Sequence, residues 1–399
     1  MEINLKESYP SDWIEYKFGY LFEFVGGMAL SRSNLSNEGI CYLHYGDIHK
    51  LSGNYIDVEK EYDTIPKLNE RLENINEKYF LRDGDIVFAD ASEDYEGIGK
   101  SVVVINKTNI PFISGLHTII ARDKSNLLDN SFKRFFLSDW NIRKQIMVIA
   151  SGISVYGISK ENIKNIRTVI PPINEQRKIA SILSTWDKAI ELKEKLIEQK
   201  KLQKKGLMQR LLTGELRLPG VKREWKTIKL GDVAEIYQPK TISQSELKKT
   251  GYPVYGANGL IGYYDKYNHE TWQIMITCRG STCGSVNKTD GKAWITGNAM
   301  VVNVDKSPNI DKDFIYYLCL IQNYKKIIGG SGQPQITKKP LEEFKIFIPL
   351  DIKEQKQIAK ILLFADKEIN FLEKELAEIK QQKKGLMQLL LTGKVRVKV

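Results

Sequence analysis

The chain has 399 residues, of which 42% are hydrophobic and 27% are charged, so it is long enough for two or three globular domains. Sixty Lys and Arg against 49 Asp and Glu give a formal charge of +11, which favours a polyanionic partner such as nucleic acid. Neither a long apolar run nor a signal-peptide pattern occurs, so the sequence argues against a membrane partner and predicts a cytoplasmic protein.

The cysteines do not indicate a metal site or disulfides. Cys41, Cys278, Cys283 and Cys319 contain no C-x-x-C pair, and a chain of this length does not need disulfides for stability. His269 lies near two of them in sequence, but the spacing fits no common zinc pattern. We expect reduced, mostly buried cysteines, no metal and no cofactor.

The first part of the chain shows strand patterns followed by a helix. Residues 85–89 and 118–121 predict strands, and residues 131–148 predict one helix with aromatic and basic side chains. A glycine-containing loop follows at 150–160; such loops are most often plain turns, but they also let the backbone approach a phosphate. The DNA contacts selected here are Arg143, Lys144, Tyr156 and Lys160.

Residues 175–212 predict a long helix, about 57 Å at roughly 1.5 Å per residue. Lys193, Lys200 and Lys204 interrupt its heptad stripe, and Leu192, Leu196 and Leu202 are alternative seam residues. Gly206 indicates either a close approach or a helix break. A Leu-Thr-Gly sequence at 212–214 predicts the helix end. The predicted packing residues are Ile179, Leu183, Trp186, Ile190, Ile197, Leu207 and Leu211.

The second part of the chain repeats this order. Strands are predicted at 273–277 and 300–304, a helix at 312–327, a glycine-rich loop at 329–338, and a long helix at 354–391 with a regular a/d stripe. The DNA contacts selected in this part are Arg279, Gln333, Gln335 and Lys338. The predicted packing residues of this second long helix are Ile358, Leu362, Ala365, Ile369, Leu372, Leu376, Ile379, Leu386 and Leu390.

The chain is a tandem duplication. Residues 175–214 align without a gap to residues 354–393, with 23 of 40 positions identical. The upstream bodies match weakly, for example at Gly115 and Gly297, and the first body carries extra residues between Tyr45 and Gly115. Two divergent bodies with nearly identical helices indicate two versions of one task on a common scaffold.

Neither apolar stripe can be buried by its own helix. We therefore expect an α+β protein in which two mixed α/β bodies are each followed by a long helix, with the helices packed as an antiparallel coiled coil of pseudo-twofold symmetry. The predicted domains are a first body at 1–173, a first spacer helix at 174–214, a second body at 215–352, and a second helix and tail at 353–399.

The pattern E-Q-x-x-I-A at the start of each long helix and K-K-G-L-M-Q-x-L-L-T-G at its end resembles the specificity subunits of Type I restriction-modification systems. The resemblance covers essentially the whole chain. It implies that each body is a target recognition domain for one half of a split DNA site. It also implies that the helices bind two modification subunits, which methylate adenine, and that the complex can recruit ATP-dependent restriction subunits for host defence.

The sequence offers no catalytic residues. The segment at 170–173 lacks the polar residue and the aromatic of an adenine methyltransferase motif, and the segment at 99–101 lacks the preceding glycine of a P-loop. The sequence therefore predicts a non-catalytic recognition subunit. The alternatives are a self-contained methyltransferase or nuclease, and a coiled-coil scaffold that does not bind DNA.

Overall fold

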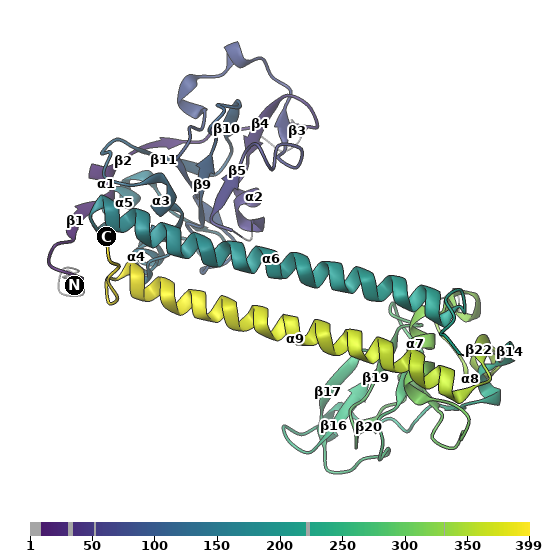
Figure 1. The fold of residues 1–399 in the computed structure, drawn as a ribbon. Helices are drawn as coiled ribbons and strands as arrows, with labels where there is room; N and C mark the ends of the chain where they lie inside the picture. The colour runs from purple at the N-terminus through teal and green to yellow at the C-terminus, as the bar shows by residue number, and fades with distance from the viewer. Residues whose placement is uncertain (1–8, 31–34, 52, 221–223, 331) are drawn as a thin grey trace. The chain divides into compact units, whose positions relative to one another are not determined.

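The computed structural model describes residues 9–30, 35–51, 53–220, 224–330 and 332–399, which form two compact units. Unit 1 consists of Met1–Leu192 with Leu376–Val399, and unit 2 of Lys193–Glu375. The long helices α6 (Ile173–Leu212) and α9 (Ile352–Leu391) each contribute one part to each unit (Figure 1). No helix of the described residues combines the length and the apolarity that crossing a bilayer requires.

Unit 1 is built around a five-stranded sheet in the order β2-β11-β7-β9-β5, antiparallel except for the pair β5 and β9. Ile86 and Phe88 lie in the hydrophobic cluster on one face, whereas Val87 and Ala89 lie in the cluster on the other. Both faces are therefore buried, which explains the continuous apolar run. The strands are β2 (Phe22–Gly26), β5 (Tyr55–Asp57), β7 (Ile86–Ala89), β9 (Ser101–Ile105) and β11 (Thr118–Asp123).

Smaller elements complete unit 1. They form a four-stranded sheet in the order β10-β4-β6-β3 and the pairs β1 with β13 and β8 with β12. These strands are β1 (Ile14–Lys17), β3 (Leu35–Ser36), β4 (Ile40–Leu43), β6 (Lys67–Leu68), β8 (Ala91–Ser92), β10 (Phe112–Ser114), β12 (Tyr156–Gly157) and β13 (Arg167–Ile170). The helices are α1 (Phe18–Leu21), α2 (Tyr45–Lys50), α3 (Asn130–Phe136), α4 (Trp140–Ile149) and α5 (Lys160–Lys164), with 3₁₀ turns at Leu72–Asn74 and Glu77–Tyr79.

Unit 2 has a smaller version of the same architecture. Its central sheet has the order β15-β21-β18-β19, accompanied by a sheet β17-β16-β20 and the pair β14 with β22. The strands are β14 (Trp225–Lys229), β15 (Glu235–Tyr237), β16 (Tyr252–Gly256), β17 (Gly259–Tyr264), β18 (Ile274–Thr277), β19 (Val286–Lys288), β20 (Trp294–Ile295), β21 (Ala299–Asn303) and β22 (Lys345–Pro349). The helices are α7 (Lys312–Ile321) and α8 (Lys338–Glu342), with 3₁₀ turns at Leu230–Asp232, Gln244–Glu246 and Tyr324–Ile327.

The predicted strands are present as β7, β11, β18 and β21, but the single helix predicted at 131–148 is wrong. It is two helices, α3 and α4, because Asp139 caps a new helix by accepting from the Asn141 N–H at 2.8 Å. Residues 312–327 are also interrupted. Helix α7 ends at Ile321, and the Asn323 side chain caps the following 3₁₀ turn.

Both long helices begin two residues before the predicted start and end at the predicted residues. The glycines that follow, Gly214 and Gly393, have left-handed φ values of 74° and 67°, as a glycine C-cap requires. Gly206 and Gly385 lie inside continuous helices, and no neighbouring atom would lie within 4 Å of a Cβ added there. They therefore mark neither a break nor a close approach.

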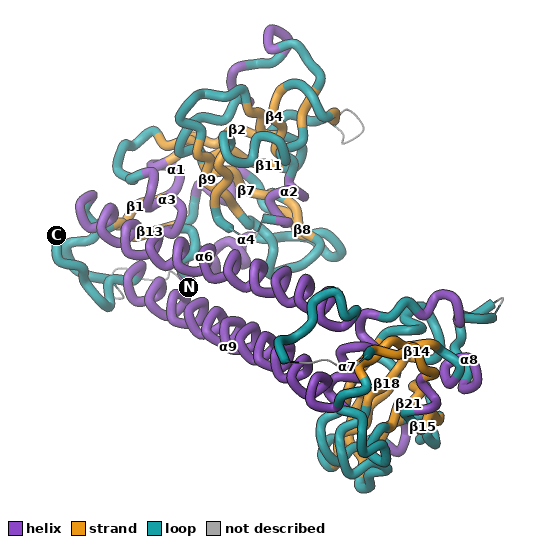
Figure 2. Tube along the Cα trace, turned by 45° about the vertical axis from the view of Figure 1, so that its right-hand side comes forward, coloured by secondary structure: helices purple, strands orange, loops and turns teal. Residues whose placement is uncertain are grey.

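The long helices run antiparallel within each unit, side by side in both views (Figure 2). In unit 2, Lys193 pairs with Glu375 and Lys200 with Glu368, so residue numbers decrease along α9 as they increase along α6. These lysines occupy the seam, whereas the alternative seam residues Leu192, Leu196 and Leu202 are exposed. None of the sixteen residues predicted to pack between the helices is exposed.

Candidate nucleic-acid interface

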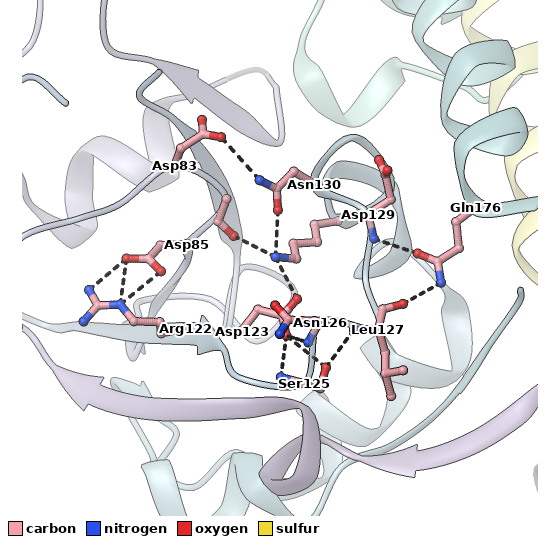
Figure 3. Close-up of polar contacts among 12 residues, drawn as sticks. Asp83, Asp85, Arg122, Asp123, Ser125, Asn126, Leu127, Asp129, Asn130 and Gln176 are labelled. Atoms are coloured by element: carbon pink, nitrogen blue, oxygen red, sulfur yellow. Dashed lines mark hydrogen bonds and ion pairs between the residues drawn. The ribbon is translucent and has the colours of Figure 1, made fainter. Parts of the chain in front are cut away.

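Each body is joined to the start of a long helix by a buried glutamine. In unit 1, Gln176 donates to the carbonyl of Leu127 (2.8 Å) and accepts from the N–H of Asp129 (2.8 Å), the residue that caps α3 (Figure 3). It also donates to the carbonyl of Pro171 (2.9 Å). Because every polar atom of this amide is paired, the body helix is fixed to α6.

In unit 2, Gln355 makes the equivalent contacts. It accepts from the N–H of Asp311, which caps α7, at 2.8 Å, and donates to the carbonyls of Pro349 (2.9 Å) and Asn309 (3.4 Å). The glutamine of the E-Q-x-x-I-A pattern therefore has the same structural task in both units.

The glutamate of the same pattern is a buried anion. Glu175, 1% exposed, accepts from Trp13 Nε1 at 3.1 Å and from Arg396 Nε at 2.7 Å. In unit 2, Glu354 accepts from Trp225 Nε1 at 3.3 Å and Arg217 Nε at 2.8 Å. Each arginine follows the end of a long helix and neutralises the carboxylate at the start of the other. We call each set of Glu, Gln, Arg and Trp a joint.

A second polar network in unit 1 lies beside its joint (Figure 3). The buried Lys133 ammonium contacts the Asp123 carboxylate and Asn130 Oδ1, both at 2.9 Å, and Arg122 pairs with Asp85 at 2.9 Å. Burial opposes ionisation of Asp123, but the hydrogen bond and charge of Lys133 outweigh it and lower the pKa of that carboxyl. These cations are therefore committed to the fold and not to DNA.

One end of each central sheet gathers the loops predicted to contact DNA. In unit 1, β2 and β7 terminate at this end, and β9 and β11 begin there. In unit 2, β15 and β18 terminate at the equivalent end, and β19 and β21 begin there. We call this end the strand-end edge. The residues after β7 and β18, Asp90 and Cys278, have equivalent positions there.

In unit 1, the loop after α4 folds back onto the strand-end edge. The Ile158 N–H donates to the Asp90 carbonyl at 2.9 Å, and Ser151 and Gly157 exchange two backbone hydrogen bonds. The tip of the loop carries apolar side chains, with Ile153 95% and Val155 55% exposed. Exposed apolar residues on a fixed loop suit contact with a base methyl group or a base step.

The four residues predicted to contact DNA from unit 1 have different surroundings. Lys144 and Lys160 are exposed, and the Lys160 ammonium lies beside the end of β2. Tyr156 is half-buried against Tyr95, with ring centroids 5.2 Å apart. The Arg143 guanidinium donates to the carbonyls of residues 96, 98 and 99, so it supports that loop, and burial lowers its pKa. A DNA contact by any of the four stays a prediction.

In unit 2, an equivalent loop is fixed by the same kind of backbone bonds. The Ile336 N–H donates to the Cys278 carbonyl at 3.0 Å, and Gly329 exchanges two backbone hydrogen bonds with Gln335. Three of the predicted DNA-contact residues meet here. Arg279 forms a β-bridge with Gln335, and Gln333 lies exposed in the same loop. Lys338 begins α8 and pairs with Glu342 at 3.5 Å.

The strand-end edge of unit 2 is also positively charged. Arg279, Lys325 and Lys326 are exposed, and among the described residues none has a carboxylate within ion-pair distance. Unpaired cations beside amide side chains are the combination that phosphate attraction and base-edge hydrogen bonding require.

Sequence reasoning missed the polar residues of the strand-end edge itself. These residues are His117 and Asp90 in unit 1 and Asn298 in unit 2. His117 and Asp90 come from turns that are far apart in sequence, yet Nδ1 and Oδ1 lie 3.1 Å apart. The repeated glycines Gly115 and Gly297 were the available signal, because they mark the turns that carry His117 and Asn298.

No group of three or more potential metal ligands occurs among the described residues, and the four cysteines are free thiols. His269 hydrogen-bonds to Tyr237 and Asn268 through its two ring nitrogens. Burial raises the pKa of Cys278 and Cys283, so both thiols stay protonated at neutral pH.

Comparisons with known proteins point to DNA specificity. The family model of the type I restriction modification DNA specificity domain matches residues 10–201 and 222–381. The putative MjaX specificity subunit of a type I restriction enzyme of Methanocaldococcus jannaschii is 27% identical over 98% of this chain and 95% of its own length. The MjaVIII specificity subunit of the same organism is 25% identical over 100% and 97%.

Two solved structures share the fold. The S subunit of a type I restriction-modification system from M. genitalium has a TM-score of 0.58 at 18% identity, covering 98% of both chains. A chain from a structure concerned with complex assembly and conformational transition of the type I R-M system has a TM-score of 0.62 at 17% identity, covering 97% of this chain and 99% of the other.

Proposed function

The chain belongs to the type I restriction modification DNA specificity family, and from this premise we propose that its two bodies read two different parts of one double-stranded DNA target. Its function as a specificity subunit is DNA sequence recognition. We assign the reading to the two strand-end edges, where loops and strand ends present side chains in each unit.

The observation that carries this proposal is the repeated frame with different side chains. The bond from Ile158 to the Asp90 carbonyl has its counterpart in the bond from Ile336 to the Cys278 carbonyl. The side chains on that frame are apolar in the loop of unit 1, with Ile153, and polar in the loop of unit 2, with Gln333. Equal frames with unequal surfaces are what a target with two unlike halves requires.

Sequence-independent affinity comes from phosphate contacts in this proposal. Lys144 and Lys160 in unit 1, and Arg279, Lys325 and Lys338 in unit 2, supply exposed cations for the DNA backbone. Such contacts position a protein on DNA without reading bases, and their signature is a strong dependence of affinity on salt.

We further propose that the chain is not itself the catalyst. Two modification subunits would bind the long helices and methylate an adenine flipped out of the duplex, and ATP-dependent restriction subunits would join the same complex on DNA in the cytoplasm. An exposed pair of aromatic side chains on α9, Phe364 (70%) and Phe371 (61%), seven residues apart outside the seam, is a suitable docking surface.

The decisive experiment is to co-express the full chain with the modification subunit encoded beside it and to map methylated adenines. We expect one split motif with a gap of constant length. Replacing residues 223–349 by the equivalent body of a relative should change one half of the motif only. Methylation or cleavage by the purified chain alone would favour an enzyme, and binding without sequence preference in the complex would favour a scaffold.

A further inference from the structure

The turn between β10 and β11 holds His117 in a left-handed conformation, with φ of 56°. Tyr42 Oη accepts from the Leu116 N–H at 2.9 Å, and Thr118 Oγ1 donates to the Gly115 carbonyl at 2.5 Å. A Cβ added to Gly115 would lie 2.3 Å from the Tyr42 ring. The backbone of His117 is therefore fixed by its surroundings, as expected of an unfavourable conformation that persists.

The His117 ring is held in one orientation and remains accessible. Its Nδ1 lies 3.1 Å from Asp90 Oδ1, and its ring packs against the Tyr45 ring in a T-shaped arrangement with centroids 5.4 Å apart. The side chain is 51% exposed. An ionised carboxylate only accepts hydrogen bonds, so Nδ1 donates to Asp90. Among the described residues, Nε2 has no hydrogen-bond partner.

The ring belongs to the strand-end edge of unit 1. The Asp90 N–H donates to the His117 carbonyl at 3.1 Å, and the Asp90 carbonyl accepts from Ile158 in the loop after α4. The fold alone does not require an imidazole here, because Gly or Asn is the residue that suits a left-handed turn best. In unit 2 the carbonyl that accepts from the Cys278 N–H, at 3.2 Å, belongs to Asn298, which does not have a left-handed φ, so this backbone bond itself does not require a histidine.

We propose that His117 reads a base edge in the part of the target bound by unit 1, and that Asp90 is the positioning residue that aims its Nε2. The inference rests on the proposed function in DNA recognition and names a specificity-determining residue within it. The Nε2 atom would hydrogen-bond to a base in the major groove, where each base pair presents a distinct pattern of donors and acceptors.

The test uses the full chain in complex with the modification subunit and a library of duplexes randomised over the target. His117→Gly keeps the left-handed backbone and removes the ring. We expect discrimination at one base-pair position of one half of the motif to fall about tenfold, with the other half unchanged. Asp90→Ala should weaken discrimination at the same position by a smaller factor, and Asp90→Asn, which keeps an oxygen acceptor, should largely restore it.

Asn109→Gly is the matched control. Asn109 also has a φ of 56°, but it follows β9 at the opposite end of the sheet. This variant therefore places a glycine at a left-handed position without changing the strand-end edge. An unchanged motif in His117→Gly, or an equal loss of binding to all sequences, would overturn the assignment. If the wild-type complex itself methylated no specific sequence, the proposed function would fail instead.

Discussion

The joints and the strand-end edges arose from the same duplication, yet the joints stayed alike and the edges diverged. In a joint, side chains make the structural bonds, so Gln176 and Gln355 have the same partners in both units. At an edge, backbone groups make those bonds, as between Ile158 and Asp90. The comparison teaches that side chains on a backbone-held frame can change without loss of the fold.

The largest expected effect lies in the joints. Gln355→Ala and Gln176→Ala should each lower the free energy of unfolding by about 3 kcal/mol, because buried backbone groups lose their partners. Calorimetric melting of the purified chain measures the loss. Gln357→Ala, exposed in the same helix turn as Gln355, is the control and should cost little. A large difference between the two joints would break their equivalence.

A smaller effect concerns a position where the two units differ beside the helix pair. Tyr317 Oη donates to Asp366 in unit 2, whereas the equivalent residue in unit 1 is Phe135, over whose ring Lys383 lies. Tyr317→Phe should destabilise by about 1 kcal/mol. Phe135→Tyr should cost little, because the carboxylate of Asp187, which pairs with the same Lys383, would accept from the added hydroxyl. Thermal unfolding separates the two, and a clear loss in Phe135→Tyr would contradict the comparison.

Charge at the edge of unit 2 should influence affinity more than specificity. Arg279→Ala in the complex should weaken binding to all duplexes and reduce the slope of log affinity against log salt by about 1. Lys306→Ala removes an equal charge at the opposite end of β21 and should leave the slope unchanged. Fluorescence anisotropy at several salt concentrations measures both. Equal slopes for the two variants would remove Arg279 from the interface.

The smallest expected effect is a pH dependence at the edge of unit 1. Burial raises the pKa of Asp90 above its usual 3.8, although the His117 charge opposes this. Ionisation of the buried carboxylate therefore destabilises the folded state. This destabilisation is absent below pH 3.8 and develops as the pH rises through the folded-state pKa. Asp90→Asn should become more stable relative to wild type over that range. If the difference in melting temperature between Asp90→Asn and the wild type were the same at pH 4 and at pH 7, this prediction would be wrong.

The long helices were predictable because their signal is local and periodic. The Leu-Thr-Gly sequence predicted the last helical residue correctly, whereas the predicted start was two residues too late in both helices. The seam lysines were ambiguous only because their partners, such as Glu375 and Glu368, lie on the other helix. The helix predicted at 131–148 failed at Asp139, because periodicity continued through a capping residue that starts a new helix.

The candidate site was predictable only in part. Glycine-containing loops are visible in sequence, so Gln335 and Arg279 could be selected, and the structure brings them together. The pair Asp90 and His117 could not be selected, because it depends on two turns that meet only after the sheet forms. The surroundings of Arg143 could not be selected either, because its guanidinium donates to the carbonyls of Ile98 and Glu96, about 45 residues away in sequence, and its contact with DNA stays a prediction.

The arginines of the joints have a consequence for how the protein is made. Glu175 lies at the start of α6, but its partner Arg396 follows it by 221 residues and is translated after both bodies. A stop codon just after Gly393 would therefore damage the body translated first and spare the one translated last. During synthesis, the carboxylate of Glu175 in the earlier body therefore lacks its arginine until Arg396 is translated. In the later body, Arg217 is translated before Glu354 and can pair with it at once.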